Sequence, residues 1–149
     1  MVQTIFIGAD HAGYEMKEKL IPFIKGFKVE VIDVGTHSSD SVDYPDFAFK
    51  VGEAVVINKD SLGILICGTG FGMCFAANKV KGIRAVDVVK PDMAPLARQH
   101  NNANILCLSA RFVTYEDNAK IINAFMNATY EERHQKRIDK VTNYEAKYD

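Results

Sequence analysis

A cysteine near the middle of the chain is followed directly by a glycine-rich loop, Gly68-Thr69-Gly70-Phe71-Gly72. Closely spaced glycines remove side chains and leave successive backbone N–H groups able to point at an anion. Such amide donors favour the thiolate form of a neighbouring cysteine, here Cys67, which can then act as a base. The same amides can stabilise negative charge that develops on a substrate oxygen. A base beside an oxyanion site is what the removal of a proton next to a carbonyl group requires.

Other interpretations of this loop remain open at this point. A glycine-rich turn can be only a tight strand-to-helix connection, and a single thiol is usually a small buried hydrophobe. A dinucleotide site would place its G-x-G-x-x-G after the first strand, whereas this loop follows the third predicted strand. The triphosphate loop G-x-x-x-x-G-K-[ST] is absent, and no flanking pattern of a thiol hydrolase accompanies Cys67.

Polar residues also follow the first two predicted strands, in Gly8-Ala9-Asp10-His11-Ala12-Gly13 and Asp33-Val34-Gly35-Thr36-His37. In a doubly wound sheet, ligands bind beyond the carboxyl ends of the strands. We therefore expect a binding role for His11, which follows Asp10 at this edge. His37 and His134 are interpreted as surface or structural residues. The polar stretch around His100 is typical of a helix C-terminus.

Five short β-branched runs alternate with segments of helical spacing. The predicted strands cover residues 4–7, 29–32, 63–67, 83–89 and 104–108. Helical spacing is seen at Met16, Leu20 and Phe23, and again at Phe47 and Val51, while Pro22 should break or kink the first helix. This alternation predicts a three-layer α/β/α Rossmann-like sandwich with a five-stranded parallel sheet.

The composition is that of an ordinary globular protein. The 149 residues suit a single domain spanning 1–149, with 48% hydrophobic and 25% charged residues. The net charge of -1 gives no cationic field for nucleic acid. Neither a membrane span of ~18 apolar residues nor a signal peptide is recognisable, which predicts a cytoplasmic protein without membrane partners. The three cysteines show no spacing typical of zinc or of a disulfide framework.

At this level of detail the sequence resembles the ribose-5-phosphate isomerase B family, from the first strand to the C-terminal helix. The motifs that carry the resemblance are Gly8-Ala9-Asp10-His11-Ala12-Gly13, Asp43-Tyr44-Pro45, Ile66-Cys67-Gly68-Thr69-Gly70-Phe71-Gly72, Ala77-Asn78-Lys79, Gly82-Ile83-Arg84-Ala85, Arg98-Gln99-His100-Asn101 and Arg133-His134-Gln135-Lys136-Arg137.

The resemblance implies a reaction of the pentose phosphate pathway, the interconversion of ribose 5-phosphate and ribulose 5-phosphate through a cis-enediolate, with no metal or organic cofactor. It implies that Cys67 is the base that moves a proton between C1 and C2. It also implies that His100 donates a proton as the furanose ring opens, and that Asp10 and Thr69 belong to the catalytic group. The substrate-binding positions implied are Asp10, His11, Tyr44, Gly68, Thr69, Gly70, Phe71, Gly72 and Asn101, and the phosphate-binding positions are His11, Arg111, Arg133 and Arg137.

The resemblance leaves two other functions open. One is a hexose-phosphate isomerase acting on allose or galactose 6-phosphate, and the other is a non-catalytic sugar-phosphate-binding module. One branch of the family replaces the cysteine by a glutamate further along the loop. Here Cys67 is present and Met73 or Cys74 stands near the glutamate position, which indicates the cysteine branch. His100 together with Asn101 favours the pentose phosphate.

The direction of the chain predicts a shared site. A helix from about Pro91 to His100 runs antiparallel to the strands, so His100 should lie at the opposite edge from Cys67. A second subunit would then supply this histidine, which predicts a homodimer, with a tetramer left open. We expect the narrow apolar stripe of a C-terminal helix, at about 131–149, to dock on that partner. Arg133 and Arg137 are four residues apart and should share one face of this helix.

Overall fold

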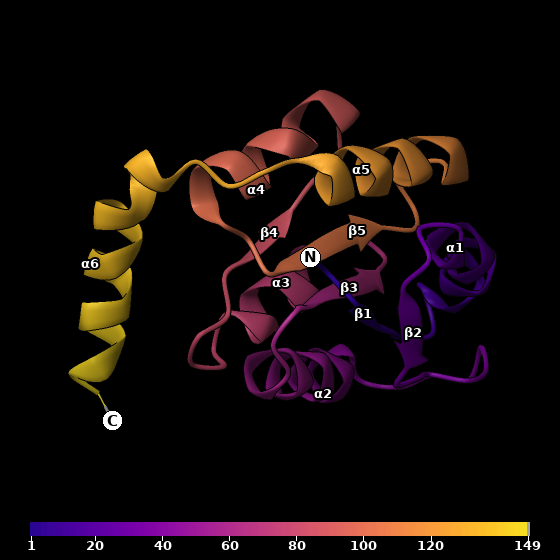
Figure 1. Ribbon diagram of the computed structural model, residues 1–149. Helices are drawn as coiled ribbons and strands as arrows, with labels where there is room; N and C mark the ends of the chain where they lie inside the picture. The colour runs from indigo at the N-terminus through magenta and orange to yellow at the C-terminus, as the bar shows by residue number, and fades with distance from the viewer. Residues whose placement is uncertain (149) are drawn as a thin grey trace.

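Five parallel strands form one sheet in this computed structural model, which describes residues 1–148. They lie side by side in the order β2-β1-β3-β5-β4 (Figure 1). The central strands β1, β3 and β5 are almost entirely buried, which explains their near-continuous apolar sequences. The strands are β1 (Thr4–Ala9), β2 (Glu30–Asp33), β3 (Ser61–Cys67), β4 (Ala85–Asp87) and β5 (Ile105–Ser109).

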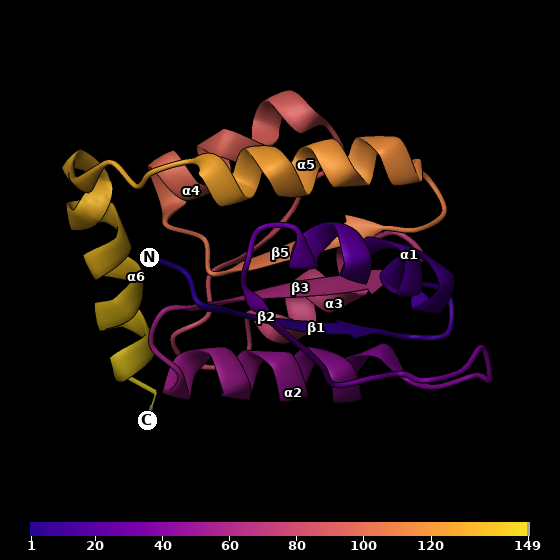
Figure 2. The ribbon, with the colours of Figure 1, turned by 45° about the vertical axis from the view of Figure 1, so that its right-hand side comes forward.

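Helices cover both faces of the sheet, so the predicted sandwich is confirmed (Figure 2). The helices α1, α4 and α5 pack on one face, where Ile24 and Phe125 meet strand residues such as Ile64. The helices α2 and α3 pack on the other face, where Val51 and Met73 meet Leu65 and other strand residues. The bounds are α1 (Tyr14–Lys25), α2 (Tyr44–Ile57), α3 (Phe71–Ala77), η1 (Pro91–Met93), α4 (Ala94–Asn101) and α5 (Tyr115–Asn127).

The strand order switches direction between β1 and β3. From β1 the chain crosses to β2 on one side, and it then returns to form β3 on the other side of β1. Ala9 of β1 pairs in register with Ile66 of β3, so Asp10 and Cys67 follow at the same level. The backbone N–H of Asp10 donates to the carbonyl of Ile66 at 3.3 Å. Such a switch in strand order is where doubly wound sheets bind ligands.

Two expectations about secondary structure are corrected. The fourth strand covers residues 85–87 and not 83–89, because β4 is an edge strand that pairs only with β5 and follows a turn that Ile83 closes by donating to Val80. The first helix continues through Pro22 to Lys25. Pro22 and Glu18 both lie on the exposed face, where water can solvate the Glu18 carbonyl that lacks its helical donor.

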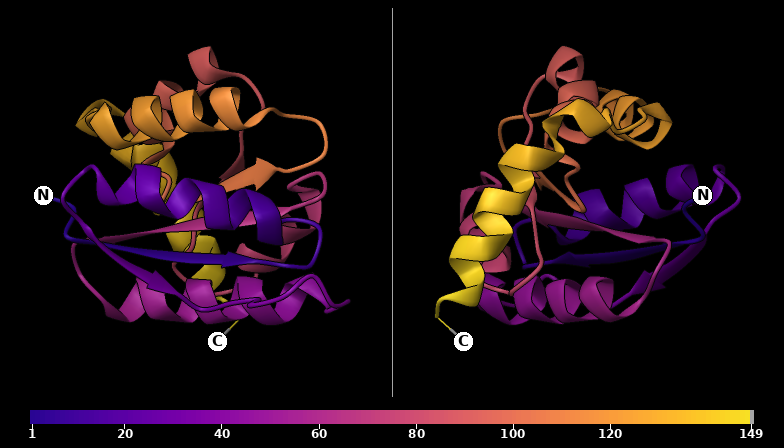
Figure 3. Two further views of the ribbon diagram at one scale, coloured as in Figure 1. Left: turned by 90° about the vertical axis from the view of Figure 1, so that its right-hand side faces the viewer. Right: turned by 60° about the vertical axis from the view of Figure 1, so that its left-hand side comes forward.

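The C-terminal helix α6 (Gln135–Ala146) projects from the sandwich after a short turn, η2 (Glu132–His134) (Figure 3). It begins later than the predicted residue 131, and Asp149 lies outside the described residues. Ile138 is buried against the body, whereas Val141 and Tyr144 of the same stripe are 59% and 60% exposed. Much of the predicted apolar stripe is therefore uncovered in one chain. No helix within residues 1–148 is long and apolar enough to cross a membrane.

A buried ion pair ties α1 to the end of β2. The side chain of Lys17 is fully buried, and its Nζ lies 2.6 Å from Oδ2 of Asp33 and 3.0 Å from Oε1 of the more exposed Glu18. The other oxygen of Asp33 accepts from the backbone N–H of Gly35 at 2.9 Å. Asp33 therefore fixes both the helix and the loop that leaves β2 at the carboxyl edge.

We expect Asp33→Asn to lower the free energy of unfolding by about 3 kcal/mol, because it leaves the buried ammonium of Lys17 without its main counter-charge. Urea unfolding followed by circular dichroism measures this difference. Asp40→Asn, an exposed position on the following loop, is the matched control and should change stability little. Equal effects of the two substitutions would contradict the role given to the buried pair.

Candidate active site

The loop after β3 holds the thiol of Cys67 from its own backbone. The N–H of Gly70 donates to Sγ of Cys67 at 3.2 Å, and the N–H of Phe71 donates to Oγ1 of Thr69 at 3.1 Å. A backbone N–H that donates to sulfur stabilises negative charge there. The loop thus places the backbone N–H of Gly70 at the sulfur of Cys67.

The other two cysteines have different surroundings. Cys107 is fully buried in β5, and burial, above all, raises the pKa of its thiol well above the usual value. Cys74 lies on α3, where its Sγ donates to the carbonyl of Ala85 at 3.4 Å. Among the described hydrogen bonds of the three thiols, only that of Cys67 comes from a backbone N–H.

Gly68 connects the loop to the end of β5 through two hydrogen bonds. The carbonyl of Gly68 accepts from Oγ of Ser109 at 2.8 Å and from the backbone N–H of Arg111 at 3.0 Å. The Arg111 guanidinium lies over the same glycine, where an added Cβ would be 3.2 Å from Nη1. The structure thus brings the predicted phosphate-binding residue Arg111 to the Cys67 loop.

Two glycines of this loop allow other side chains to pack closely against the backbone, and one of them also has a backbone conformation that favours glycine. Gly70 has a φ of +85°, and a Cβ there would lie 2.3 Å from Oδ1 of Asp87. A Cβ on Gly72 would lie 2.7 Å from the ring of Tyr44, which packs at the start of α3. Tyr44, predicted to line the site, therefore touches the loop directly.

Asp10 and His11 lie at the adjoining end of β1. Oδ1 of Asp10 accepts from the N–H groups of Ala12 and Gly13 at 3.0 and 3.1 Å, so one carboxylate oxygen is committed to its own turn. Nδ1 of His11 lies 3.2 Å from both the backbone N and O of Val42, and Nε2 therefore points away from that loop. Both predicted residues belong to the half-site around Cys67.

The remaining predicted residues lie at the opposite edge of the sheet. His100 and Asn101 end α4, close to where β4 and β5 begin, and they line a cavity of about 470 Å³ together with Arg137. The other residues that line this cavity are Arg84, Ala85, Val86, His134, Ile138 and Val141. The prediction that His100 lies far from the Cys67 loop in its own chain is thus confirmed.

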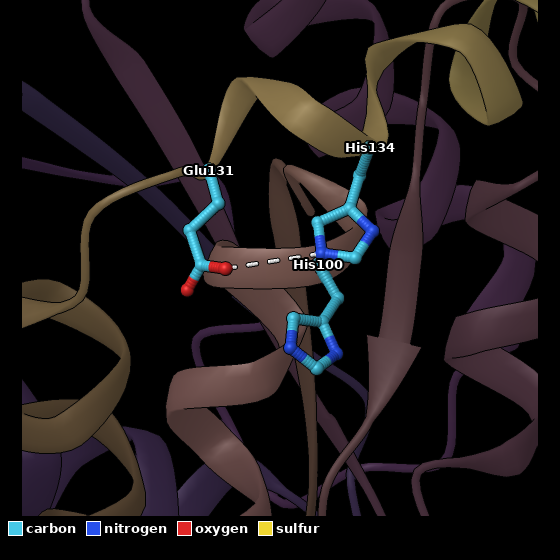
Figure 4. Close-up of side chains that lie close together, drawn as sticks. All are labelled: His100, Glu131 and His134. Carbon is cyan, nitrogen blue, oxygen red and sulfur yellow. Dashed lines mark ion pairs between the residues drawn. The ribbon is translucent and has the colours of Figure 1, made fainter.

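His100, Glu131 and His134 bring three donor atoms within 4.8 Å of one another (Figure 4). Imidazole and carboxylate groups are both zinc ligands. Nη1 of Arg137 lies 3.2 Å from Nδ1 of His134, and arginine can only donate. A metal-binding histidine donates from its second nitrogen, whereas this one accepts there and so carries its proton on Nε2. The surroundings favour a hydrogen-bonded cluster over a coordinated ion.

Arg133 differs from its prediction in position. It lies in the turn η2, before α6 begins, so that only Arg137 belongs to the helix. Its guanidinium is exposed and pairs with Oε1 of Glu131 at 2.8 Å from Nη2. The helix starts later than expected because residues 132–134 form a tighter 3-10 turn.

Together these residues form two half-sites, one at each edge of the sheet. The half-site at the carboxyl edge contains Asp10, His11, Tyr44, the Cys67 loop and Arg111. The half-site at the amino edge contains His100, Asn101 and Arg137. Strand β3 has seven residues, so at about 3.3 Å per residue the edges are roughly 20 Å apart. One chain alone cannot apply both half-sites to one small molecule.

Comparison with known proteins identifies the family. The model of the ribose/galactose isomerase family matches residues 5–141 of the chain. The chain belongs to this family. Ribose-5-phosphate isomerase B of Escherichia coli is 44% identical over 142 residues, 95% of each chain.

Two solved structures of the family match nearly the whole fold. The ribose-5-phosphate isomerase B of Mycoplasma genitalium, with bound ribulose-5-phosphate, has a TM-score of 0.93 at 50% identity and covers 98% of both chains. The enzyme of Clostridium thermocellum has a TM-score of 0.95 at 46% identity over 99% of this chain and 100% of its own.

Two polar residues of this isomerase chain were missed by sequence reasoning. His134, interpreted as a surface or structural histidine, is buried and stacks on His100 with ring centroids 4.6 Å apart. Asp87, inside a predicted strand, packs against Gly70, and its Oδ1 is buried without a hydrogen-bond partner among the described residues. The position of His134 within the Arg133 to Arg137 motif was the only sequence signal for either residue.

Burial raises the pKa of Asp87 from an ordinary value near 3.8 to about 6. A carboxyl group with a raised pKa in the folded state binds more protons there than in the unfolded chain. Stability is therefore greatest below the unfolded pKa and falls as pH rises between the two values. The ionised carboxylate packs against Gly70 and lies close enough to Cys74 and Cys107 to raise their pKa values.

We expect Asp87→Asn to be more stable than the wild type at pH 8, by about 1 kcal/mol for a partly exposed carboxyl, because the amide removes the buried charge. The advantage should shrink as pH falls below 6 and vanish near pH 4. Denaturant unfolding at pH 4, 6 and 8 measures it. A stability gain that is the same at all three pH values would show that the ionisation of Asp87 is not its cause.

Proposed function

We propose that this chain interconverts ribose 5-phosphate and ribulose 5-phosphate. The observation that carries the proposal is the likeness, over 98% of both chains, to an isomerase that holds ribulose-5-phosphate. The thiol at the head of a backbone-lined loop fits the same reaction, which consists of proton transfers alone. A reducing cytoplasm would keep the thiol of Cys67 from oxidation.

In this proposal Cys67 is the base. Its thiolate removes the proton from C2 of the open-chain aldose, and the electron pair forms the C1–C2 double bond of a cis-enediolate with negative charge on O1. The N–H groups of the loop from Gly68 to Gly72 stabilise that charge, as an oxyanion site does. A proton passes from O2 to O1 beside the hydroxyl of Thr69, and the thiol of Cys67 then returns its proton to C1.

His100 and Asp10 act before this step. Ribose 5-phosphate exists mainly as a furanose, so its ring must open to expose the carbonyl. His100 gives a proton to the ring oxygen while the C1 hydroxyl loses one, and the C1–O4 bond breaks. The oxygen of Asp10 that is not used by its own turn is the acceptor that we propose for the hydroxyl proton.

Cations from both edges bind the phosphate. His11 and Arg111 belong to the half-site around Cys67, and Arg137 belongs to the other half-site. Arg133 lies in η2, just before the helix that carries Arg137. Arginine binds phosphate oxygens through two parallel hydrogen bonds. Tyr44, Phe71 and Asn101 complete the substrate site.

A two-fold homodimer would join the two half-sites. The separation of the edges supports this arrangement, since each His100 half-site would then face the Cys67 loop of the other subunit. The uncovered apolar residues Val141 and Tyr144 of α6 offer a docking surface for the partner. Two equivalent active sites follow, each built from both chains.

We expect Cys67→Ala to lose at least about a thousandfold in kcat, because no other group replaces the base. Ribulose 5-phosphate in deuterated water tests the mechanism, since wild-type enzyme should exchange a C1 proton with solvent and the variant should not. NMR follows this exchange.

Cys74→Ala is the matched control and should keep near-normal exchange, because its thiol faces Ala85. Full activity of Cys67→Ala would defeat the proposed mechanism. Allose 6-phosphate and galactose 6-phosphate in the same assay test the hexose alternative, and faster turnover of either would replace the proposed substrate.

Mixing Cys67→Ala with His100→Ala should restore activity if the sites are shared. Each mixed dimer then has one site with both defects and one with neither, so random mixing restores about a quarter of wild-type activity. Native mass spectrometry of differently tagged subunits verifies exchange. Proven mixed dimers without activity would disprove shared sites.

A further inference from the structure

The imidazole of His134 has no part in the steps above, yet it packs directly on the residue proposed to open the ring. The His134 and His100 rings are tilted by 38°, with centroids 4.6 Å apart (Figure 4). His134 is only 6% exposed, and its Nε2 has no hydrogen-bond partner among the described residues. A polar atom left without a partner in such a place needs an explanation.

The protonation state of His134 is set by its neighbours. Because Arg137 donates to Nδ1, the proton of the neutral ring lies on Nε2, which faces Oε1 of Glu131 at 3.9 Å. Burial lowers the pKa of His134, and Arg133, His100 and Arg137 lower it further, against the opposing effect of Glu131. The ring is therefore neutral at neutral pH.

The backbone holds the two histidines together within one chain. The N–H of Glu131 donates to the carbonyl of Gln99 at 3.0 Å, next to His100, and the N–H of His134 donates to the carbonyl of Glu131 at 3.2 Å. The turn η2 is therefore fixed on the end of α4. The backbone segments that carry the two rings are therefore held together within one chain.

We infer that His134 is a positioning residue for His100, which rests on the proposed role of His100 in ring opening. The buried face of His134 restricts the rotation of the His100 ring at a helix end where it would otherwise sample several rotamers. Because His134 is neutral, it places no second positive charge against the ring of His100. The cavity that both rings line is also bordered by Arg84 and Arg137.

The test compares His134→Ala with His134→Phe, which keeps a ring face that cannot be protonated. We expect the alanine variant to lose about thirtyfold to a hundredfold in kcat for ribose 5-phosphate, since misplacement of a catalytic group has effects of that size. The phenylalanine variant should recover most of the loss. Equal loss in both variants would contradict positioning by the ring face.

A double-mutant cycle separates action through His100 from general damage. In a His100→Ala background, His134→Ala should lower kcat by less than twofold, because the group that it positions is already gone. Additive losses would overturn the inference. Thermal melting of each variant checks that the fold is intact.

Proton exchange distinguishes this inference from the proposed function. Ribulose 5-phosphate has no furanose ring to open, so its C1 exchange in deuterated water should persist in His134→Ala and vanish only in Cys67→Ala. Loss of exchange in folded His134→Ala would overturn the inference. Exchange that persists in Cys67→Ala would instead defeat the proposed function.

A chelator tests the rival assignment of His100, Glu131 and His134 to a metal. Dialysis of the wild type against EDTA should leave kcat unchanged. A loss that added zinc restores would assign the three residues to an ion and overturn the inference.

Discussion

The direction of the chain in a parallel sheet determines how this molecule can build a site. Every strand ends at the same edge, and every crossover helix carries the chain back to the other edge. Residues that follow strands, such as Asp10 and Cys67, are therefore gathered at one edge. Residues that end a helix, such as His100 and Asn101, lie at the opposite edge. No side-chain movement in one chain can overcome a separation set by the length of the strands.

Within this constraint, the carboxyl edge depends on main-chain hydrogen bonds more than on side chains. The loop after β3 is held by Ser109 and Arg111 at the end of β5, and its own amide holds the sulfur of Cys67. Glycine at positions 70 and 72 lets Asp87 and Tyr44 approach the backbone closely. A site built in this way is fixed in place by the sheet, with little freedom left to its loop.

The sequence predicted those parts of the structure that depend on local pattern. Buried central strands have continuous apolar runs, and their order along the chain indicated the sandwich and the edge on which Cys67 lies. The length of α4 could be estimated from the rise per residue of an α-helix, so the edge at which His100 lies could be predicted. The family motifs supplied the roles, which composition and spacing could not.

What the sequence missed depends on contacts between distant segments. His134 looked like an isolated histidine because its partner is 34 residues away in the chain. The hydrogen bond from the backbone N–H of Glu131 to the carbonyl of Gln99 helps to bring the two segments together. Burial raises the pKa of Asp87, which packs against Gly70 of a loop that is distant in the sequence. The effect of Pro22 was overestimated, because a helical pattern does not reveal which face water reaches.

The exposed stripe of α6 has a consequence for how such an enzyme behaves in the cell. If Val141 and Tyr144 become buried only in contact with a second copy of the chain, then catalysis requires the same surface as dimer formation. Dilution below the dissociation constant would separate the half-sites while leaving each subunit folded, so specific activity would fall with concentration. Expression level would then control the rate per molecule as well as the number of molecules.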